Sequence, residues 1–253
     1  KSSRSSKRRR NLLLTFALLV CVILLGVGVY LTVLTVARNT IQALPISVDK
    51  EIGDFAIENM DLQGSPVEDQ VVVGAIEEMV SRLEKHAAVK GFEFHVQVID
   101  ADIVNAFALP GGQIVVYTGL IKSAKRAEQV AGVVAHEIAH VTMHHGAKMM
   151  IRSIGSQILS VGGAIVSPKN SGQWLAVSSA MFQQINMGYG REAELESDSQ
   201  GMLNSVEAGY HPIAMVNFLK NLRKQEIMSG QAYHGFQASH PETKERIVKA
   251  GTF

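Results

Sequence analysis

The first part of the chain separates into a basic segment and an uncharged apolar one. Residues 1–10 contain six Lys and Arg residues, whereas residues 11–37 contain no Asp, Glu, Lys or Arg. This uncharged run exceeds the roughly 20 residues that a helix needs to cross a bilayer. The pattern predicts a basic tail over 1–10, a transmembrane anchor over 11–37, a juxtamembrane linker over 38–46 and a folded domain over 47–253.

Two other interpretations of the apolar run fit less well. A cleaved signal peptide has an apolar core of about 7–15 residues, which is shorter than this run. Lipidation at Cys21 would require a small residue before the cysteine, where the chain has Val20. The excess of Lys and Arg before the run, against only Arg38 and Lys50 soon after it, predicts a cytoplasmic N-terminus. The domain would then lie across the membrane, in the periplasm if the cell is bacterial.

Apolar positions at helical spacing dominate the rest of the chain and predict a mainly helical domain. One signal is the run Ser65-Pro66-Val67-Glu68, in which a capping serine, a proline at the first helical position and a glutamate three residues after the cap predict a helix that ends near Gly91. The other predicted helices are a short one capped by Ser47, one over 124–150 and an apolar one over 174–187. The apolar run over 154–166 is too short to span a membrane and is interpreted as core or as a segment against the bilayer.

Three segments have the pattern of strands. Residues 92–98 alternate apolar and polar side chains, as a half-buried strand does. Residues 105–109 and 113–118 predict two more strands joined by the glycine-dependent turn Pro110-Gly111-Gly112. The predicted fold class is therefore α+β, mainly α, with a small antiparallel sheet and one transmembrane helix before it.

The pentapeptide HEIAH lies inside the predicted helix over 124–150. Its two histidines, His136 and His140, are offset by roughly 40° around a helix axis and about 6 Å along it, so both imidazoles can bind one metal ion. Zinc held by two imidazoles and one carboxylate keeps a position for water and lowers the pKa of that water to about 7. Glu137 lies beside the metal and would take the proton, which is the chemistry of a metallopeptidase.

A pair of structural histidines on an ordinary helix is the simpler alternative. Apolar residues surround the motif on nearly every side, and a helix that is apolar all round is buried. Burying two imidazoles and a carboxylate without partners costs several kcal/mol. A metal ion would satisfy them.

Composition restricts the other classes of function. The 253 residues carry a net charge of +1, and the basic residues gather at the N-terminus, so nothing favours a nucleic-acid partner. The one cysteine, Cys21, excludes both an internal disulfide framework and a cysteine-based zinc site.

The third ligand has to come from outside the HEIAH helix. His144 would lie about 12 Å along the helix axis from His136, too far to share an ion. In the segment 191–201, Glu194 and Asp198 fall on one helix face, so Glu194 can bind the metal while Asp198 accepts the free N–H of a ligating histidine. A charged, solvated helix face remains the simpler interpretation of this segment.

HEIAH followed by GREAELESDSQG resembles the gluzincin peptidases that include HtpX, the CAAX prenyl proteases and the BepA-type periplasmic proteases, metallopeptidase family forty-eight. NAFALPGG, from Asn105, and SHP…RI, from Ser239 to Ile247, are similar to further family segments. The resemblance implies a zincin-like fold with Glu194 as third zinc ligand and Asp198 as its partner. The chain has Ser197 where the family usually has alanine.

The resemblance also implies roles for two late residues. His240 would donate to the oxyanion of the tetrahedral intermediate, and Arg246 would hold the nearby carboxylates. Without the resemblance, Ser239-His240-Pro241 is simply a helix start. His234 could bind the open zinc position and keep the enzyme latent, although an exposed loop histidine is the plainer interpretation.

These observations predict a membrane-anchored endopeptidase with one Zn²⁺ per chain and Glu137 as general base. Its substrates would be polypeptides, such as unfolded or misassembled membrane or envelope proteins, which suits protein quality control. A zinc-stabilised, membrane-tethered chaperone or scaffold without proteolysis is the alternative.

Overall fold

The computed structural model describes most of the chain outside its two ends and several internal segments. The described residues are 13–32, 46–149, 188–229, 235–240, 246 and 248. The chain divides into two compact units, 1–44 and 45–253. The apolar run over 154–166, the helix predicted over 174–187 and the residue His234 lie outside the described residues.

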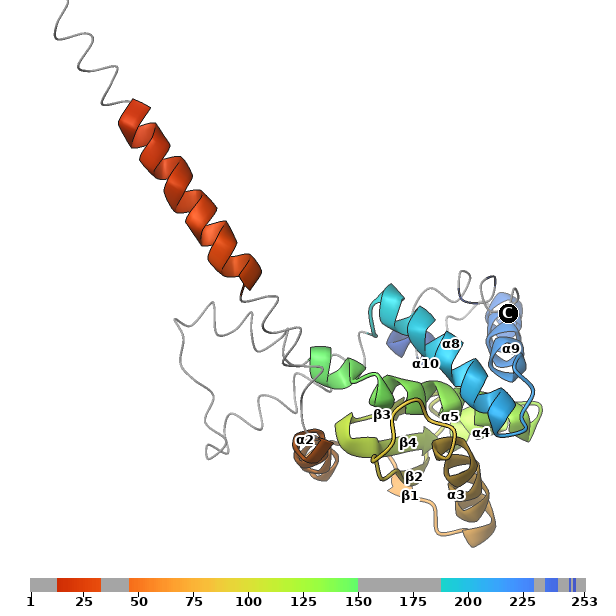
Figure 1. Cartoon of the computed structure of the whole chain (residues 1–253). Coiled ribbons are helices and arrows are strands. Elements are labelled where there is room, and N and C mark those ends of the chain that lie inside the picture. The colour runs from red at the N-terminus through yellow and green to blue at the C-terminus, as the bar shows by residue number, and fades with distance from the viewer. Residues whose placement is uncertain are drawn as a thin grey trace, which may run out of the picture. The chain divides into compact units, whose positions relative to one another are not determined.

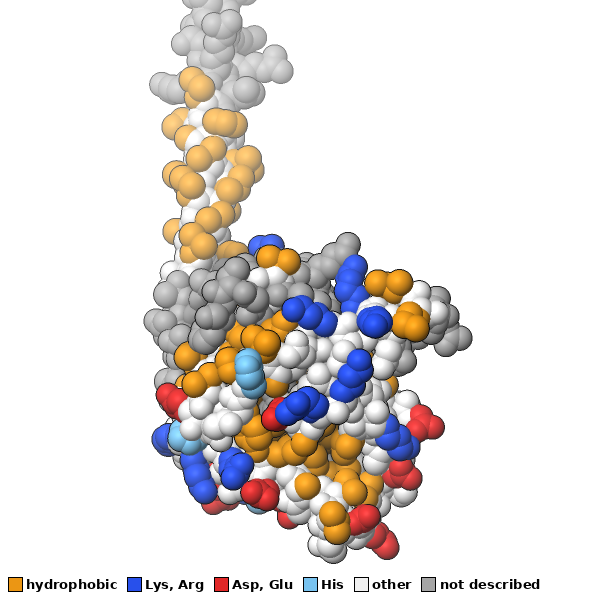
Figure 2. Space-filling view, turned by 90° about the vertical axis from the view of Figure 1, so that its right-hand side faces the viewer, with side chains coloured by type: hydrophobic (Ala, Val, Ile, Leu, Met, Phe, Trp, Pro, Cys, Tyr) orange, Lys and Arg blue, Asp and Glu red, His pale blue; other side chains and the backbone are white. Residues whose placement is uncertain are grey.

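The N-terminal unit contains one apolar helix, Leu13–Thr32. It is 20 residues long with a mean hydropathy of 2.7, and none of it is buried. Its large apolar side chains are exposed along its length, as Figure 2 shows. Such a helix is long and apolar enough to cross a bilayer. Its length and composition suit a membrane anchor or a signal sequence.

The second unit is mainly helical and contains a four-stranded sheet (Figure 1). The strands are β1 (Ser65–Pro66), β2 (His95–Asp100), β3 (Ala106–Ala108) and β4 (Gln113–Tyr117), and their order across the sheet is β1-β2-β4-β3. The prediction of an α+β fold with a small sheet is confirmed.

The sheet is mixed, so the prediction that it is antiparallel throughout was wrong for one pair. β2 and β4 are parallel, with His95 opposite Gln113, whereas β1–β2 and β3–β4 are antiparallel. The cause is the hairpin of β3 and β4, which turns at the 3₁₀ helix η1 (Pro110–Gly112). After this turn β4 runs antiparallel to β3. It lies between β3 and β2, so its second neighbour is β2, with which it runs parallel.

The helix start predicted at Ser65 was also wrong. Ser65 and Pro66 form β1, and the next residue, Val67, continues the contact because its N–H donates to the Val98 carbonyl at 2.8 Å. Helix α3 (Gln70–Glu84) begins later, where the Asp69 side chain accepts from the Val71 N–H at 2.9 Å. Tertiary pairing with β2 therefore overrides the local capping pattern.

Helix α5 (Ala127–Thr142) forms the centre of the second unit. Every residue from Gln129 to Thr142 is buried. α3, α8 (Arg191–Glu207) and α9 (Ala214–Ser229) pack against α5, which also contacts β3. This explains why the HEIAH segment is apolar on every side.

α5 is shorter than the helix predicted over 124–150. It ends at Thr142, because Met143 is near φ −90° and ψ 3° and His144 has a φ of +55°. The chain is helical again over 145–149. A left-handed residue of this kind breaks a helix even though neither proline nor glycine occupies the position of the break.

The remaining helices are short or lie beside the sheet. They are α2 (Ile46–Glu58), α4 (Thr118–Ser123) and α10 (Phe236–Ser239). α2 packs directly on η1, since a Cβ at Gly53 would collide with the Pro110 carbonyl oxygen. This contact fixes the turn that joins β3 to β4.

Candidate metal centre

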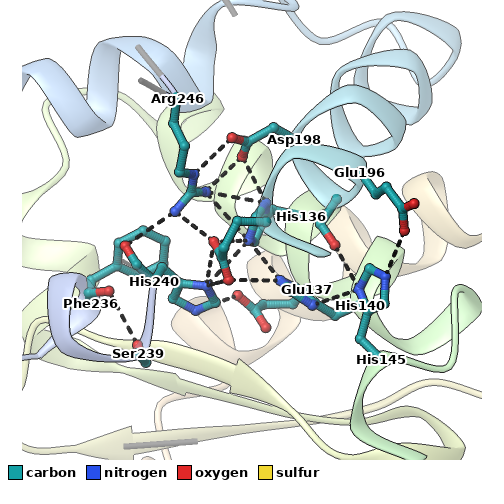
Figure 3. A network of polar contacts seen from close by, with 12 residues as sticks. His136, Glu137, His140, His145, Glu196, Asp198, Phe236, Ser239, His240 and Arg246 are labelled. Carbon is teal, nitrogen blue, oxygen red and sulfur yellow. Dashed lines mark hydrogen bonds and ion pairs between the residues drawn. The ribbon is translucent and has the colours of Figure 1, made fainter. Parts of the chain in front are cut away.

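Helix α5 presents His136, Glu137 and His140 to one buried point (Figure 3). Their exposed fractions are 0%, 0% and 1%. The Nε2 atoms of His136 and His140 lie 3.0 Å apart. The spacing of four residues thus converges two imidazoles on one face of the helix, as the sequence predicts.

Helix α8 crosses α5 closely enough to add a carboxylate. A Cβ at Gly201 would lie 3.0 Å from the His136 backbone nitrogen, so glycine permits the helices to approach at this point. Glu194, 1% exposed, then places one oxygen 3.4 Å from His136 Nε2 and the other 3.5 Å from His140 Nε2. The structure therefore brings Glu194 together with the two histidines.

This cluster has the donors and the spacing of a metal site. His136, His140, Glu194 and His240 each offer a ligand atom, and these atoms lie within 4.8 Å of one another. Four ligands at about 2.1 Å in a tetrahedron lie about 3.4 Å apart, which agrees with the distances of 3.0, 3.4 and 3.5 Å between the first three. Two imidazoles and a carboxylate are also a ligand set that zinc enzymes use.

The protonation of His140 and Glu194 suits metal binding. Burial lowers the pKa of His140 to about 4, so its imidazole is neutral near pH 7. For Glu194, burial alone would raise the pKa, but the charges of His240 and Arg246 outweigh it and lower the pKa well below its usual value. A neutral imidazole and an ionised carboxylate are the forms that bind metals. For His136, burial and the charge of Arg246 lower the pKa, but the hydrogen bonds with Asp198 and Glu194 outweigh them and raise it, so a metal would displace a proton there.

Asp198 and Arg246 form a second buried layer around His136. Asp198 Oδ1 lies 3.0 Å from His136 Nδ1, the nitrogen that faces away from His140. Arg246 donates to both Asp198 oxygens at 2.7 and 2.6 Å, and its Nη1 lies 2.7 Å from a Glu194 oxygen. Burial would raise the pKa of Asp198, but the hydrogen bonds from Arg246 and His136 lower it.

His240 reaches the cluster from the end of α10. Its ring stacks on Phe236 with centroids 4.4 Å apart, and its Nδ1 lies 3.0 and 3.1 Å from the Glu194 oxygens. Burial alone favours the neutral ring, but the carboxylates of Glu194 and Glu137 raise the pKa of His240 to about 10. The structure therefore brings His240 and Arg246, two residues singled out from the sequence, to the same cluster.

Three polar atoms of the cluster lack a hydrogen-bond partner among the described residues. They are both carboxylate oxygens of Glu137 and Nε2 of His240. The two groups lie close, with 3.3 Å between His240 Nε2 and Glu137 Oε1. Buried polar atoms normally have partners, and the contact that the described residues supply here is this ion pair between His240 and Glu137.

Sequence reasoning gave no role to Tyr189, His145 and Glu196, which form one group with His140. Tyr189 stacks on the His140 ring with centroids 4.0 Å apart, and His145 Nδ1 lies 3.0 Å from His140 Nδ1. His145 Nε2 in turn contacts Glu196 of α8. The signal in the sequence was the histidine at position 145, after the motif. The helix predicted over 124–150 runs through His145 and so directs its ring away from His140.

A family model for Peptidase family M48 matches residues 72–252 of the chain. The chain belongs to this family. The match includes the HEIAH helix, α8 and the segment that contains His240 and Arg246. Membership of family M48 confirms the resemblance that the sequence motifs indicate.

Among known proteins, the chain is 28% identical over 220 residues to the beta-barrel assembly-enhancing protease of Escherichia coli K12, which covers 83% of the chain and 44% of that protein. It is 33% identical over 165 residues to mitochondrial metalloendopeptidase OMA1 of Arabidopsis thaliana, covering 64% of the chain and 32% of the relative. Human metalloendopeptidase OMA1 is 29% identical over 162 residues, covering 60% and 30%. The chain spans less than half the length of these M48 relatives.

Replacing Arg246 by alanine tests the second layer. This change leaves the carboxylates of Asp198 and Glu194 buried without their cation, so we expect the free energy of unfolding to fall by about 3–5 kcal/mol. Arg126→Ala is the matched control, since its ion pair with Glu128 is exposed and should leave unfolding nearly unchanged. Urea denaturation of both variants measures the difference, and equal stabilities would contradict the account of Arg246.

Proposed function

We propose that the chain is a membrane-anchored, zinc-dependent endopeptidase that hydrolyses peptide bonds in polypeptides. The observation that carries the proposal is the fully buried carboxylate of Glu137, which faces His240 and lies beside the convergent donors of His136, His140 and Glu194. A scaffold site would need the three donors alone. A buried carboxylate at such a position, with no hydrogen bond among the described residues, has a use in acid–base chemistry.

His136, His140 and Glu194 would hold one Zn²⁺. When bound, zinc supplies a Lewis acid that lowers the pKa of water and polarises the scissile carbonyl. Asp198 accepts from Nδ1 of His136, which keeps its Nε2 free to bind the ion. Arg246 neutralises the two carboxylates and holds them in place.

Glu137 would act as general base and then as general acid. Its oxygens accept the proton of the attacking water and return it to the leaving amine. His240 Nε2, which lies 3.3 Å from Glu137, is placed to donate to the oxyanion of the tetrahedral intermediate. One donor of this kind contributes about 3 kcal/mol to transition-state binding.

Strand β3 offers a place for an extended substrate. Among the described strands it lies at the edge of the sheet, and it contacts α5. Asn105 and Leu109 bond to β4, so the backbone groups of Ala106 and Ala108 point away from β4 by the alternation of an antiparallel pair. The Asn105 side chain already accepts from the Ala106 N–H, so within the described part of the chain Ala108 and the Ala106 carbonyl remain to pair with a substrate backbone.

Glu137→Gln tests the central step. The variant should keep about one zinc per chain and lose casein cleavage by about 10²–10⁴-fold, because the amide cannot accept the proton. Glu128→Gln, on the same helix but at an exposed position, should cleave casein as the wild type does. Zinc analysis and a casein assay measure both.

Two results would contradict the proposal. Full activity of Glu137→Gln would remove the role of the base. No proteolysis by the wild-type chain, combined with unfolding on metal removal, would favour the zinc-stabilised scaffold instead.

We propose that the basic tail over 1–10 stays in the cytoplasm and that the helix Leu13–Thr32 anchors the peptidase domain across the membrane. Misassembled membrane or envelope proteins are the substrates that such a position would offer.

A C-terminal alkaline phosphatase fusion in a bacterium tests this topology. Alkaline phosphatase is active only on the oxidising side of the membrane, where its disulfides form. We therefore expect phosphatase activity of the fusion in the membrane fraction. A second fusion, of green fluorescent protein to the C-terminus, reports the opposite orientation. Fluorescence of that fusion together with an inactive phosphatase fusion would contradict the proposed orientation. Release of active phosphatase fusion into the soluble fraction would contradict the anchor.

A further inference from the structure

A chain of polar contacts leads from His140 to the protein surface (Figure 3). His140 Nδ1 lies 3.0 Å from Nδ1 of His145, and His145 Nε2 lies 3.1 Å from a carboxylate oxygen of Glu196. His140 and His145 are 1% and 4% exposed, whereas the side chain of Glu196 is 58% exposed. Ser197 Oγ lies 3.2 Å from Nδ1 of His145.

We propose that His145 and Glu196 are positioning residues for zinc, which hold the His140 ring in the tautomer and orientation that bind the ion. This inference rests on the proposed function, because it concerns the zinc that His136, His140 and Glu194 would hold. It adds two residues that contact neither substrate nor metal.

The direction of the hydrogen bonds follows from the geometry. His140 faces His136 and Glu194 with Nε2, so Nε2 is the metal-binding atom and the proton must be on Nδ1. This N–H donates to Nδ1 of His145, which is therefore unprotonated at that atom. His145 carries its proton on Nε2 and donates it to the Glu196 carboxylate, so the N–H groups of both rings have an acceptor.

The break after α5 makes this arrangement possible. On a continuous helix, His145 would lie about 140° around the axis from His140 and the two rings would not meet. The left-handed conformation of His144, with φ +55°, redirects the chain, and the ring centroids of His140 and His145 then lie 4.9 Å apart. Burial lowers the pKa of His145, consistent with a neutral ring that accepts from His140.

The two histidine ligands thus have different outer partners. His136 contacts the buried carboxylate of Asp198 directly, at 3.0 Å. His140 reaches a carboxylate only through His145, and that carboxylate belongs to the surface residue Glu196. Helix α8 supplies both acids as well as Glu194. A single surface substitution at position 196 should therefore change the affinity for zinc.

Zinc affinity of full-length variants, measured by competition with a chromophoric chelator, tests the proposal. His145→Phe removes both nitrogens at similar ring size, and we expect zinc affinity to fall about 10–100-fold. His145→Gln keeps one acceptor and one donor and should recover a large part of this loss. Glu196→Gln should lower affinity by a smaller factor, and Glu192→Gln, an exposed residue on the same helix that is not a partner of His145, should not change it.

Thermal unfolding of the metal-free variants separates positioning from general stability, since a positioning role predicts similar midpoints for Glu196→Gln and Glu192→Gln. Wild-type zinc affinity in His145→Phe would overturn the proposal. Should that variant fail to fold, an affinity of Glu196→Gln equal to that of Glu192→Gln would overturn it instead.

The wild-type measurement distinguishes this proposal from the proposed function. If the wild-type chain binds no zinc, both are overturned. If the wild-type chain binds zinc and cleaves casein while His145→Phe keeps its affinity, only the role of His145 is overturned.

Discussion

The contact between α5 and α8 is the constraint on which the candidate site depends. α5 supplies two imidazoles and a carboxylate that are fully buried, and burying such groups is unfavourable unless partners are supplied. α8 brings those partners, but only because Gly201 allows it to lie against the backbone of His136. A larger residue there would separate Glu194 from the histidines and leave both helices with unpaired polar groups.

Charge is balanced within this contact by residues from distant parts of the chain. Arg246 lies against two α8 carboxylates, and His240 lies between Glu194 and Glu137. The C-terminal segment that contains them is tied to the sheet, since Ser239 donates to Asn105 at 3.0 Å and the Phe236 N–H donates to the Val104 carbonyl at 2.7 Å. The edge of the sheet, α8 and the HEIAH helix therefore form one polar cluster enclosed by an apolar core.

Much of this site could be predicted from the sequence, because its residues lie at positions that helical geometry fixes. The spacing of His136 and His140, and of Glu194 and Asp198, places each pair on one face whatever surrounds it. Three features depend on tertiary contacts instead. β4 inserts beside β2, Ser65 pairs as a strand in place of capping a helix, and His144 adopts a left-handed conformation. The last of these concealed His145, since its contact with His140 exists only where the helix is broken.

The central claim is that one zinc ion joins α5 to α8. Anomalous diffraction at the zinc absorption edge, from crystals of the purified full-length protein, locates such an ion directly. The account predicts one peak at about 2.1 Å from Nε2 of His136, Nε2 of His140 and a carboxylate oxygen of Glu194. A zinc-replete protein without a peak there, or with Glu194 directed away from the ion, would contradict it.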